Sequence, residues 1–222
     1  MIEAFHAVLF DTPAFHVLFS NSALITMGVL VGQTLVAPPA AWALARCSFP
    51  GRKALIALYL LLLVLPFQAV LLPTYFVLHS LGILNTLWAV ILPGAFSTFP
   101  VLIMLATFST ISASVVESAR LDGASEWDVF FRIGLPLGAP GIFAALLLGF
   151  FEYWNVLEQP LAYLTNQALW PIALFSPSTA NSAAIMGAVA ILSAIPGLLL
   201  FGWGHRYLEK GLGDHSTTQE DR

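Results

Sequence analysis

The chain has 222 residues, of which 59% are hydrophobic and 9% are charged, and its formal net charge is −4. A soluble domain carries about a quarter charged residues, so this composition excludes an ordinary water-soluble protein. The mean hydropathy of +0.87 agrees with that exclusion. We therefore expect an all-α membrane protein built as one transmembrane domain over residues 1–222.

Five apolar stretches reach the roughly 20 residues that a helix needs to cross the hydrocarbon core. Residues 1–20 mix polar and apolar side chains and predict an interfacial segment. No basic residue precedes the first apolar run, so we expect no cleavable signal peptide. Residues 158–182 are rich in Pro, Asn, Ser and Thr and predict a loop that can include a short helix. The expected spans of this five-span bundle are residues 21–45, 54–77, 87–108, 137–157 and 183–203.

The second and third expected spans carry two prolines each, which free backbone carbonyls inside the membrane. We interpret these prolines as kinks in preference to a direct role in substrate passage. They are Pro66, Pro73, Pro93 and Pro100.

The Lys and Arg residues all fall on one side of the five expected spans. The segments on the other side, residues 1–20, 79–86 and 158–182, contain none. Basic residues concentrate on the cytoplasmic side of membrane proteins, so the N-terminus is expected outside and the C-terminus in the cytoplasm. The polar segment of residues 110–136 is then cytoplasmic. The eight basic residues are Arg46, Arg52, Lys53, Arg120, Arg132, Arg206, Lys210 and Arg222.

This polar segment predicts two short helices around a turn. Ser114 and Glu117 have the spacing of a capping box that would begin the first helix. Asp122-Gly123 supplies a residue for the left-handed conformation that ends it. Ser125 then caps a second helix whose first turn carries anions, which the helix dipole favours.

Three aromatic residues of the second helix, Trp127, Phe130 and Phe131, lie three and four positions apart and so share one face. One interpretation packs this face on the protein's own spans or in the lipid headgroup region. The other docks it into a groove of another protein. Periodicity alone leaves both open.

Polar side chains inside the expected spans are few and gather near the outer ends. Carboxylates at such a depth are costly and usually face a bundle interior or a watery cavity. A cluster of polar side chains interleaved with aromatic residues suits a neutral hydroxylated ligand, which it can bind by hydrogen bonding and stacking. The alternative assigns Tyr153 and Trp154 to the interfacial aromatic belt. The candidate substrate-pathway residues are Gln68, Tyr75, Glu152 and Asn155.

Several chemistries are excluded by motif. A phosphate-binding P-loop requires Gly-Lys followed by Ser or Thr, and neither Lys53 nor Lys210 follows a glycine. The chain therefore cannot bind ATP in that way. The five histidines have no metal-ligand spacing, and the single Cys47 has no partner for an internal disulfide. We therefore expect no catalytic residue and no metal. We also expect no nucleic-acid partner, since the basic residues all lie close to the spans.

Four motifs follow one another along the chain. The one in the polar segment is Glu117-Ser118-Ala119, then Asp122-Gly123-Ala124-Ser125, then Ile133-x-Leu135-Pro136. The other three are Ala41-Trp42-Ala43-Leu44-Ala45-Arg46 with Phe49-Pro50-Gly51-Arg52, Leu81-Gly82-Ile83-Leu84-Asn85-Thr86, and Trp154-Asn155 with Pro160-Leu161. In order and spacing they resemble the permeases of binding-protein-dependent ABC importers, in particular the carbohydrate-uptake permeases of the MalG type. The resemblance covers nearly the whole chain.

This resemblance implies that the polar segment is a coupling loop seated in a groove of a cytoplasmic ATPase subunit, which favours docking over self-packing. The implied partners are a second homologous permease subunit, two ATPase subunits that carry ATP and Mg, an extracytoplasmic sugar-binding protein and the lipid bilayer of a bacterial-type inner membrane. The implied coupling residues are Glu117, Ala119, Asp122, Gly123, Ala124, Trp127, Phe130, Ile133 and Pro136.

The sequence departs from the family pattern in two ways. Ser118 replaces an alanine of the motif, and we expect little effect because serine is also small. Such permeases usually have about six spans with the N-terminus inside, whereas this chain begins where the first span would already have ended. Either the start site is misassigned or the chain is a true five-span variant.

Three alternatives stay open. A secondary transporter would need ionisable groups deep within its spans, for which only Glu152 qualifies. A membrane enzyme or scaffold would show a catalytic cluster on one face, and none is visible. An importer of another solute, such as a polyol or glycerol phosphate, fits less well in the phosphate case because no basic residue lies outside or within the spans.

Overall fold

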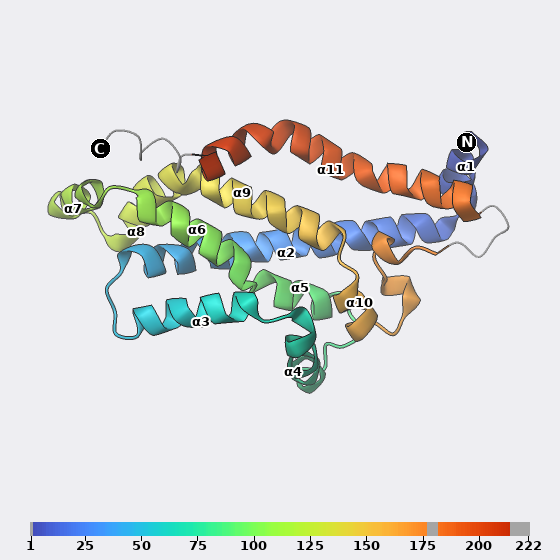
Figure 1. The fold of residues 1–222 in the computed structure, drawn as a ribbon, viewed down its shortest axis with the longest axis horizontal. Coiled ribbons are helices and arrows are strands. Elements are labelled where there is room, and N and C mark those ends of the chain that lie inside the picture. Colours follow the sequence, from blue (N-terminus) through green and yellow to red (C-terminus); the bar gives the residue numbers. More distant parts are fainter. Residues whose placement is uncertain (1, 177–181, 214–222) are drawn as a thin grey trace. The chain divides into compact units, whose positions relative to one another are not determined.

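The structure is a computed structural model that describes residues 2–176 and 182–213. Every regular element in these ranges is helical, which confirms the predicted class (Figure 1). Residues 177–181 of the expected outer loop and Arg222 lie outside the described residues. The α-helices are α1 (Ile2–His6), α2 (Pro13–Arg46), α3 (Arg52–Val64), α4 (Phe67–Ser80), α5 (Trp88–Ala95), α6 (Thr98–Thr110), α7 (Ala113–Leu121), α8 (Glu126–Val129), α9 (Leu135–Trp154), α10 (Glu158–Tyr163) and α11 (Ser182–Gly213).

Four helical segments of the described chain are long and apolar enough to cross a membrane, and α3 and α4 reach that length only when taken together. The four are Pro13–Arg46, Trp88–Thr110, Glu126–Trp154 and Ala183–Gly204. The first begins eight residues before the expected span, so the expected interfacial segment is partly wrong. Proline is favoured at the first position of a helix because its missing N–H would be unpaired there in any case. Pro13 occupies that position in α2.

The second expected span is interrupted and is not a single kinked helix. Leu65 is extended, with φ −65° and ψ 129°, and separates α3 from α4. A residue that precedes proline is pushed out of the helical region by the proline ring, and Leu65 precedes Pro66. Pro73, by contrast, lies inside α4.

The chain folds into two compact units, and each of the five expected spans contributes residues to both. Unit 1 comprises Met1–Val31, Phe67–Ala95 and Phe150–Gly202, and unit 2 comprises Gly32–Pro66, Phe96–Gly149 and Trp203–Arg222, within the described ranges. In the sequence, every Lys and Arg falls within the bounds of unit 2. The core of unit 2 is built from Trp42, Met104, Phe108, Val116, Val129, Phe130 and their apolar neighbours.

In unit 1, hydrogen bonds from α2 fix the segment after α10. The Asn21 amide donates to the carbonyls of Ala168 and Trp170 at 2.8 and 3.0 Å. The Ser22 hydroxyl accepts from the backbone N–H of Ile172 at 2.8 Å. These contacts join residues about 150 positions apart and tie to α2 a segment whose own backbone bonds are confined to two short 3-10 turns, Gln167–Leu169 and Ile172–Leu174.

The Leu81–Thr86 motif anchors the same segment from another side. Asn85 adopts φ +59°, a left-handed conformation that asparagine tolerates better than most residues. Its side-chain oxygen accepts from the N–H of Asn166 at 2.8 Å, and its own N–H donates to the carbonyl of Tyr163 at 3.0 Å. The motif therefore forms a turn that holds the chain around α10.

Candidate functional site

The polar elbow, defined here as residues 112–134, contains α7 and α8 and lies wholly in unit 2. Helix α7 ends at a glycine in the left-handed conformation, Gly123, with φ +86°. The N–H of Ala124 donates to the carbonyl of Ala119, and the N–H of Gly123 donates to the carbonyl of Arg120, at 3.0 and 3.1 Å. This pair of bonds is a Schellman motif, and it confirms the turn predicted at Gly123.

The start of α7 differs from the prediction. The N-cap residue is Ser112, without a side-chain capping bond, and the helix begins at Ala113. Ser114 lies inside the helix, where its hydroxyl contacts that of Ser112 at 2.7 Å. The expected capping box of Ser114 with Glu117 is therefore wrong. The last extended residue before the helix is Ser112, so Ser112 occupies the N-cap position and not Ser114.

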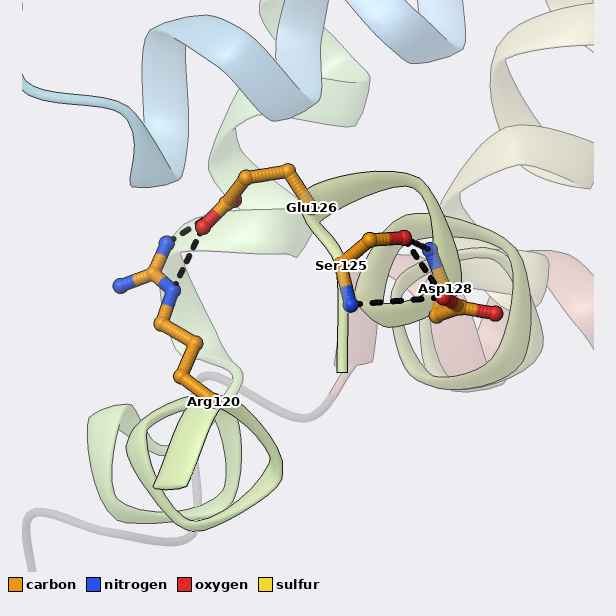
Figure 2. Close-up of polar contacts among 4 residues, drawn as sticks. All are labelled: Arg120, Ser125, Glu126 and Asp128. Carbon is orange, nitrogen blue, oxygen red and sulfur yellow. Dashed lines mark hydrogen bonds and ion pairs between the residues drawn. The ribbon is translucent and has the colours of Figure 1, made fainter. Parts of the chain in front are cut away.

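The second predicted cap is confirmed. The Ser125 hydroxyl accepts from the backbone N–H of Asp128 at 3.2 Å, and the Asp128 carboxylate accepts from the Ser125 N–H at 3.3 Å (Figure 2). This is a complete capping box. Hydrogen bonds from the Ser125 hydroxyl and backbone, aided by Arg132, hold the pKa of the Asp128 carboxyl below its usual value.

An ion pair closes the elbow across its turn. The Arg120 guanidinium donates from Nε and Nη2 to the two carboxylate oxygens of Glu126, at 2.8 and 3.1 Å (Figure 2). Two parallel bonds of this kind fix orientation as well as distance, so the C-terminal end of α7 is tied to the first residue of α8. Sequence reasoning missed this pair; the available signal was two opposite charges on either side of a predicted turn.

The three aromatic rings of the elbow do not share one exposed face. Phe130 is only 4% exposed and packs in the core of unit 2, whereas Trp127 is 65% and Phe131 56% exposed. The rings of Trp127 and Phe131 stack at 5.9 Å. A π-helical turn, Phe130–Gly134, changes the helical register between α8 and α9. Phe130 is therefore a packing residue of this chain, which argues against the direct coupling contact that the family resemblance implies for it.

Five of the predicted coupling residues line a shallow cleft of about 490 Å³ between α7 and the α8 turn. Glu117, Trp127 and Pro136, the last of which lies just beyond the elbow, are exposed but do not line it. The cleft carries both acidic and apolar side chains at an open surface, a composition suited to contact with another protein. It is lined by Ala119, Asp122, Gly123, Ala124, Asp128, Val129, Arg132 and Ile133.

The four predicted pathway residues all belong to unit 1. The Gln68 amide donates to the carboxylate of Glu158 at 3.3 Å. Asn155, the residue after the end of α9, donates to the α9 carbonyl of Phe151 at 2.9 Å and borders an apolar cleft of about 470 Å³. Tyr75 is half-buried and Glu152 is exposed. The structure thus brings Gln68 to Glu158 and places Asn155 at a cleft, and no hydrogen bond of the described residues joins the four into one cluster.

Trp154 is a buried packing residue between two helices. It is 6% exposed, and its indole N–H donates to the carbonyl of Ser193 at 2.9 Å, which ties α9 to α11. Within the described ranges, no group of three or more His, Cys, Asp or Glu side chains could hold a metal ion.

Comparison with known proteins gives a family match over most of the chain. The family described as "Binding-protein-dependent transport system inner membrane component" matches residues 37–214. The polygalacturonan/rhamnogalacturonan transport system permease protein YtcP of Bacillus subtilis (strain 168) is 30% identical, covering 91% of this chain and 80% of that protein. The arabinooligosaccharides transport system permease protein AraQ of Halalkalibacterium halodurans is 31% identical, covering 87% of this chain and 71% of that protein.

A solved structure has the same fold. A chain of a bacterial ABC transporter involved in the import of the acidic polysaccharide alginate matches with a TM-score of 0.79 at 22% identity, covering 92% of this chain and 78% of that chain. A second structure of a bacterial alginate ABC transporter, in complex with an alginate pentasaccharide-bound periplasmic protein, gives a TM-score of 0.66 at 21% identity. At these identities the match shows a shared fold.

Proposed function

Because the chain belongs to the family of binding-protein-dependent transport system inner membrane components, we propose that it is the permease subunit of an ATP-driven carbohydrate importer. The proteins of this family are multi-pass membrane subunits of transport systems. The carbohydrate class is supported by the similar permeases, which are named for the transport of polygalacturonan, rhamnogalacturonan and arabinooligosaccharides.

The observation that carries this proposal is the polar elbow. Its two helices are preassembled by the Schellman turn, the capping box and the Arg120–Glu126 pair, so a partner can bind it without first ordering it. Its exposed side chains, which we call the docking surface, include Glu117, Asp122 and Trp127, whose ring stacks on that of Phe131. In this proposal the docking surface binds in a groove of an ATPase subunit, and closure of the ATPase pair on ATP moves the elbow.

The orientation follows from the basic residues. All of them lie within the bounds of the unit that contains the elbow, which supports a cytoplasmic elbow in a bacterial-type inner membrane. The N-terminus is then outside and the C-terminus inside, with α3 and α4 counted as one span of five. Unit 1 would receive substrate from an extracytoplasmic sugar-binding protein, and a second permease subunit would complete the pathway.

The pathway residues fit a neutral hydroxylated ligand. Gln68 and Glu158 offer a hydrogen-bonding pair, and Asn155 stands at a cleft bordered by Phe151 and Trp154. Amide groups beside aromatic rings provide the hydrogen bonds and flat apolar surfaces that sugar rings require.

Reconstitution tests the proposed function. The chain is purified with its co-expressed partners and placed in liposomes with ATP enclosed, after the cognate binding protein has been screened by thermal shift against mono- and oligosaccharides. We expect uptake of the stabilising sugar that requires ATP, the ATPase subunits and the binding protein together. Uptake that persists without the ATPase subunits, or that follows an imposed ion gradient, would contradict the proposal.

A further inference from the structure

The chain enters the elbow through a short joint, Ile111 and Ser112, that lies outside both flanking helices. Ile111 and Ser112 are both extended, with ψ near 134° and 133°, so α6 and α7 are separated by a non-helical joint. Ser112 makes no side-chain cap to α7. A joint of this kind lets α7 change its direction relative to α6 unless another element holds it.

Arg46, in the last turn of α2, holds this joint. Its Nε and Nη2 donate to the carbonyl of Phe108 at 3.1 and 2.7 Å, and Nη2 also contacts the carbonyls of Ser109, at 3.4 Å, and Ile111. The last carbonyls of a helix lack partners within it and carry the negative end of its dipole. One guanidinium therefore satisfies the end of α6 and the first residue of the joint together.

The same turn of α2 holds the exit from the elbow. The ring of Trp42 is 4% exposed and lies 6.0 Å from the ring of Phe130 and 5.3 Å, edge to face, from that of Phe108. A Cβ added at Gly134 would stand 2.8 Å from the Trp42 ring, so the π-helical turn lies directly against it. Trp42 and Arg46 are four positions apart and so lie on one face of α2.

From this geometry we infer that the last turn of α2 is a brace that holds both ends of the elbow, and that Arg46 is a positioning residue for energy coupling. The inference rests on the proposed function. A displacement imposed on α7 and α8 passes to α2 only while the joint is held. Without the guanidinium, the joint bends and ATP hydrolysis continues with less transport.

The chain offers a matched control. Arg52 also donates to helix-terminal carbonyls, those of Leu44 and Ala45 at 2.6 and 3.1 Å, but these belong to α2 itself and not to the elbow. Arg46→Gln and Arg52→Gln each remove one charge and the guanidinium that caps helix-terminal carbonyls, three carbonyls for Arg46 and two for Arg52. Arg46→Lys keeps the charge and a donor but loses the planar fork that reaches several carbonyls.

The test measures sugar uptake and ATP hydrolysis in the reconstituted complex. We expect Arg46→Gln to assemble and hydrolyse ATP, with uptake per ATP lowered about tenfold, the scale of a lost charged hydrogen bond. Arg46→Lys should restore part of that ratio, and Arg52→Gln should keep the wild-type ratio. A spin label on Leu121→Cys, in a Cys47→Ser background, should become more mobile in Arg46→Gln only.

The outcomes separate the two proposals. If the wild-type complex shows no ATP-driven uptake, the proposed function fails. If wild type is coupled and Arg46→Gln keeps the same ratio and label mobility, the brace is refuted while the function stands. An equal loss in Arg46→Gln and Arg52→Gln also refutes it, because the effect is then general to α2. If Arg46→Gln does not assemble, the ratio and label mobility of Arg46→Lys decide: wild-type values refute the brace.

Discussion

Gly123 shows how one backbone conformation shapes the elbow. Its φ of +86° lies in the region that costs a non-glycine residue about 1–2 kcal/mol. No atom lies within 4 Å of a Cβ built there, so Gly123→Ala would strain the backbone without a clash. We expect this variant to insert and assemble but to hydrolyse ATP with reduced uptake, measured as sugar transported per ATP in liposomes.

Gly82 supplies the control for that variant. It also has a positive φ, +69°, and open space around its Cβ, but it belongs to unit 1. Gly82→Ala should carry similar backbone strain and keep the coupling ratio. Equal losses in the two variants would mean that the strain acts on stability and not on the elbow.

Glu117 tests the electrostatic side of the docking surface. It is exposed and makes no ion pair with Arg120 or Arg132 in the elbow, whose pairs are with Glu126 and Asp128. Glu117→Lys breaks neither elbow ion pair and removes only a weak attraction to Arg120, so we expect intact protein and impaired coupling to the ATPase. Co-purification of the ATPase and the uptake-to-hydrolysis ratio measure this, and normal values for both would contradict the assignment.

Asp128 makes the elbow sensitive to acid. Its folded pKa is depressed, so its contribution to stability is fully present above the unfolded value of about 3.9 and is lost as the pH falls through the folded value. Ser125→Ala removes the hydroxyl bond and should raise the Asp128 pKa, which moves that loss to higher pH. Carboxyl NMR of Asp-labelled protein in nanodiscs measures the pKa, and an unchanged titration would contradict the role of Ser125.

The sequence predicted those parts of the elbow in which the type of a single residue determines the backbone conformation. Gly123 and Ser125 occupy the turn and the cap that their types favour. The prediction that Ser114 caps α7 was wrong, because Ser112, two positions earlier, is also a serine and the helix already begins after it. The inward position of Phe130 was not predictable, since it depends on the π-helical turn and on Trp42, which is distant in sequence.

At the scale of elements, the segment after α10 depends on α2. Asn21→Ala would leave the carbonyls of Ala168 and Trp170 without their side-chain donor, and a hydrogen bond of this kind contributes about 0.5–1.5 kcal/mol. We expect faster hydrogen exchange in residues 164–176, measured by mass spectrometry. Ser80→Ala, which removes an exposed bond to the Val77 carbonyl, is the control and should change nothing there.

The expected spans illustrate what apolar length can and cannot reveal. The stretches at residues 21–45 and 183–203 lie inside the single helices α2 and α11. The stretch at 54–77 contains two prolines, of which only Pro66 interrupts the helix. Composition cannot distinguish these two outcomes, because a proline inside a helix is tolerated where neighbouring groups satisfy the freed carbonyl.

For the whole molecule, the separation of charge between the units predicts the orientation. In a Cys47→Ser background, a cysteine at Ser80 in unit 1 should react with an impermeant maleimide from outside intact cells. A cysteine at Leu121, which is 89% exposed on the elbow, should react only in inside-out vesicles. The reverse pattern would overturn the orientation and, with it, the cytoplasmic elbow.

The most direct measurement is photo-crosslinking from the elbow in native membranes. A benzoylphenylalanine in place of Trp127, whose side chain is 65% exposed, would react with whatever lies against the docking surface. The account predicts an adduct with an ATPase subunit, identified by mass spectrometry, whose yield changes when ATP is added. An adduct only with lipid, with this chain itself or with an extracytoplasmic protein would contradict it.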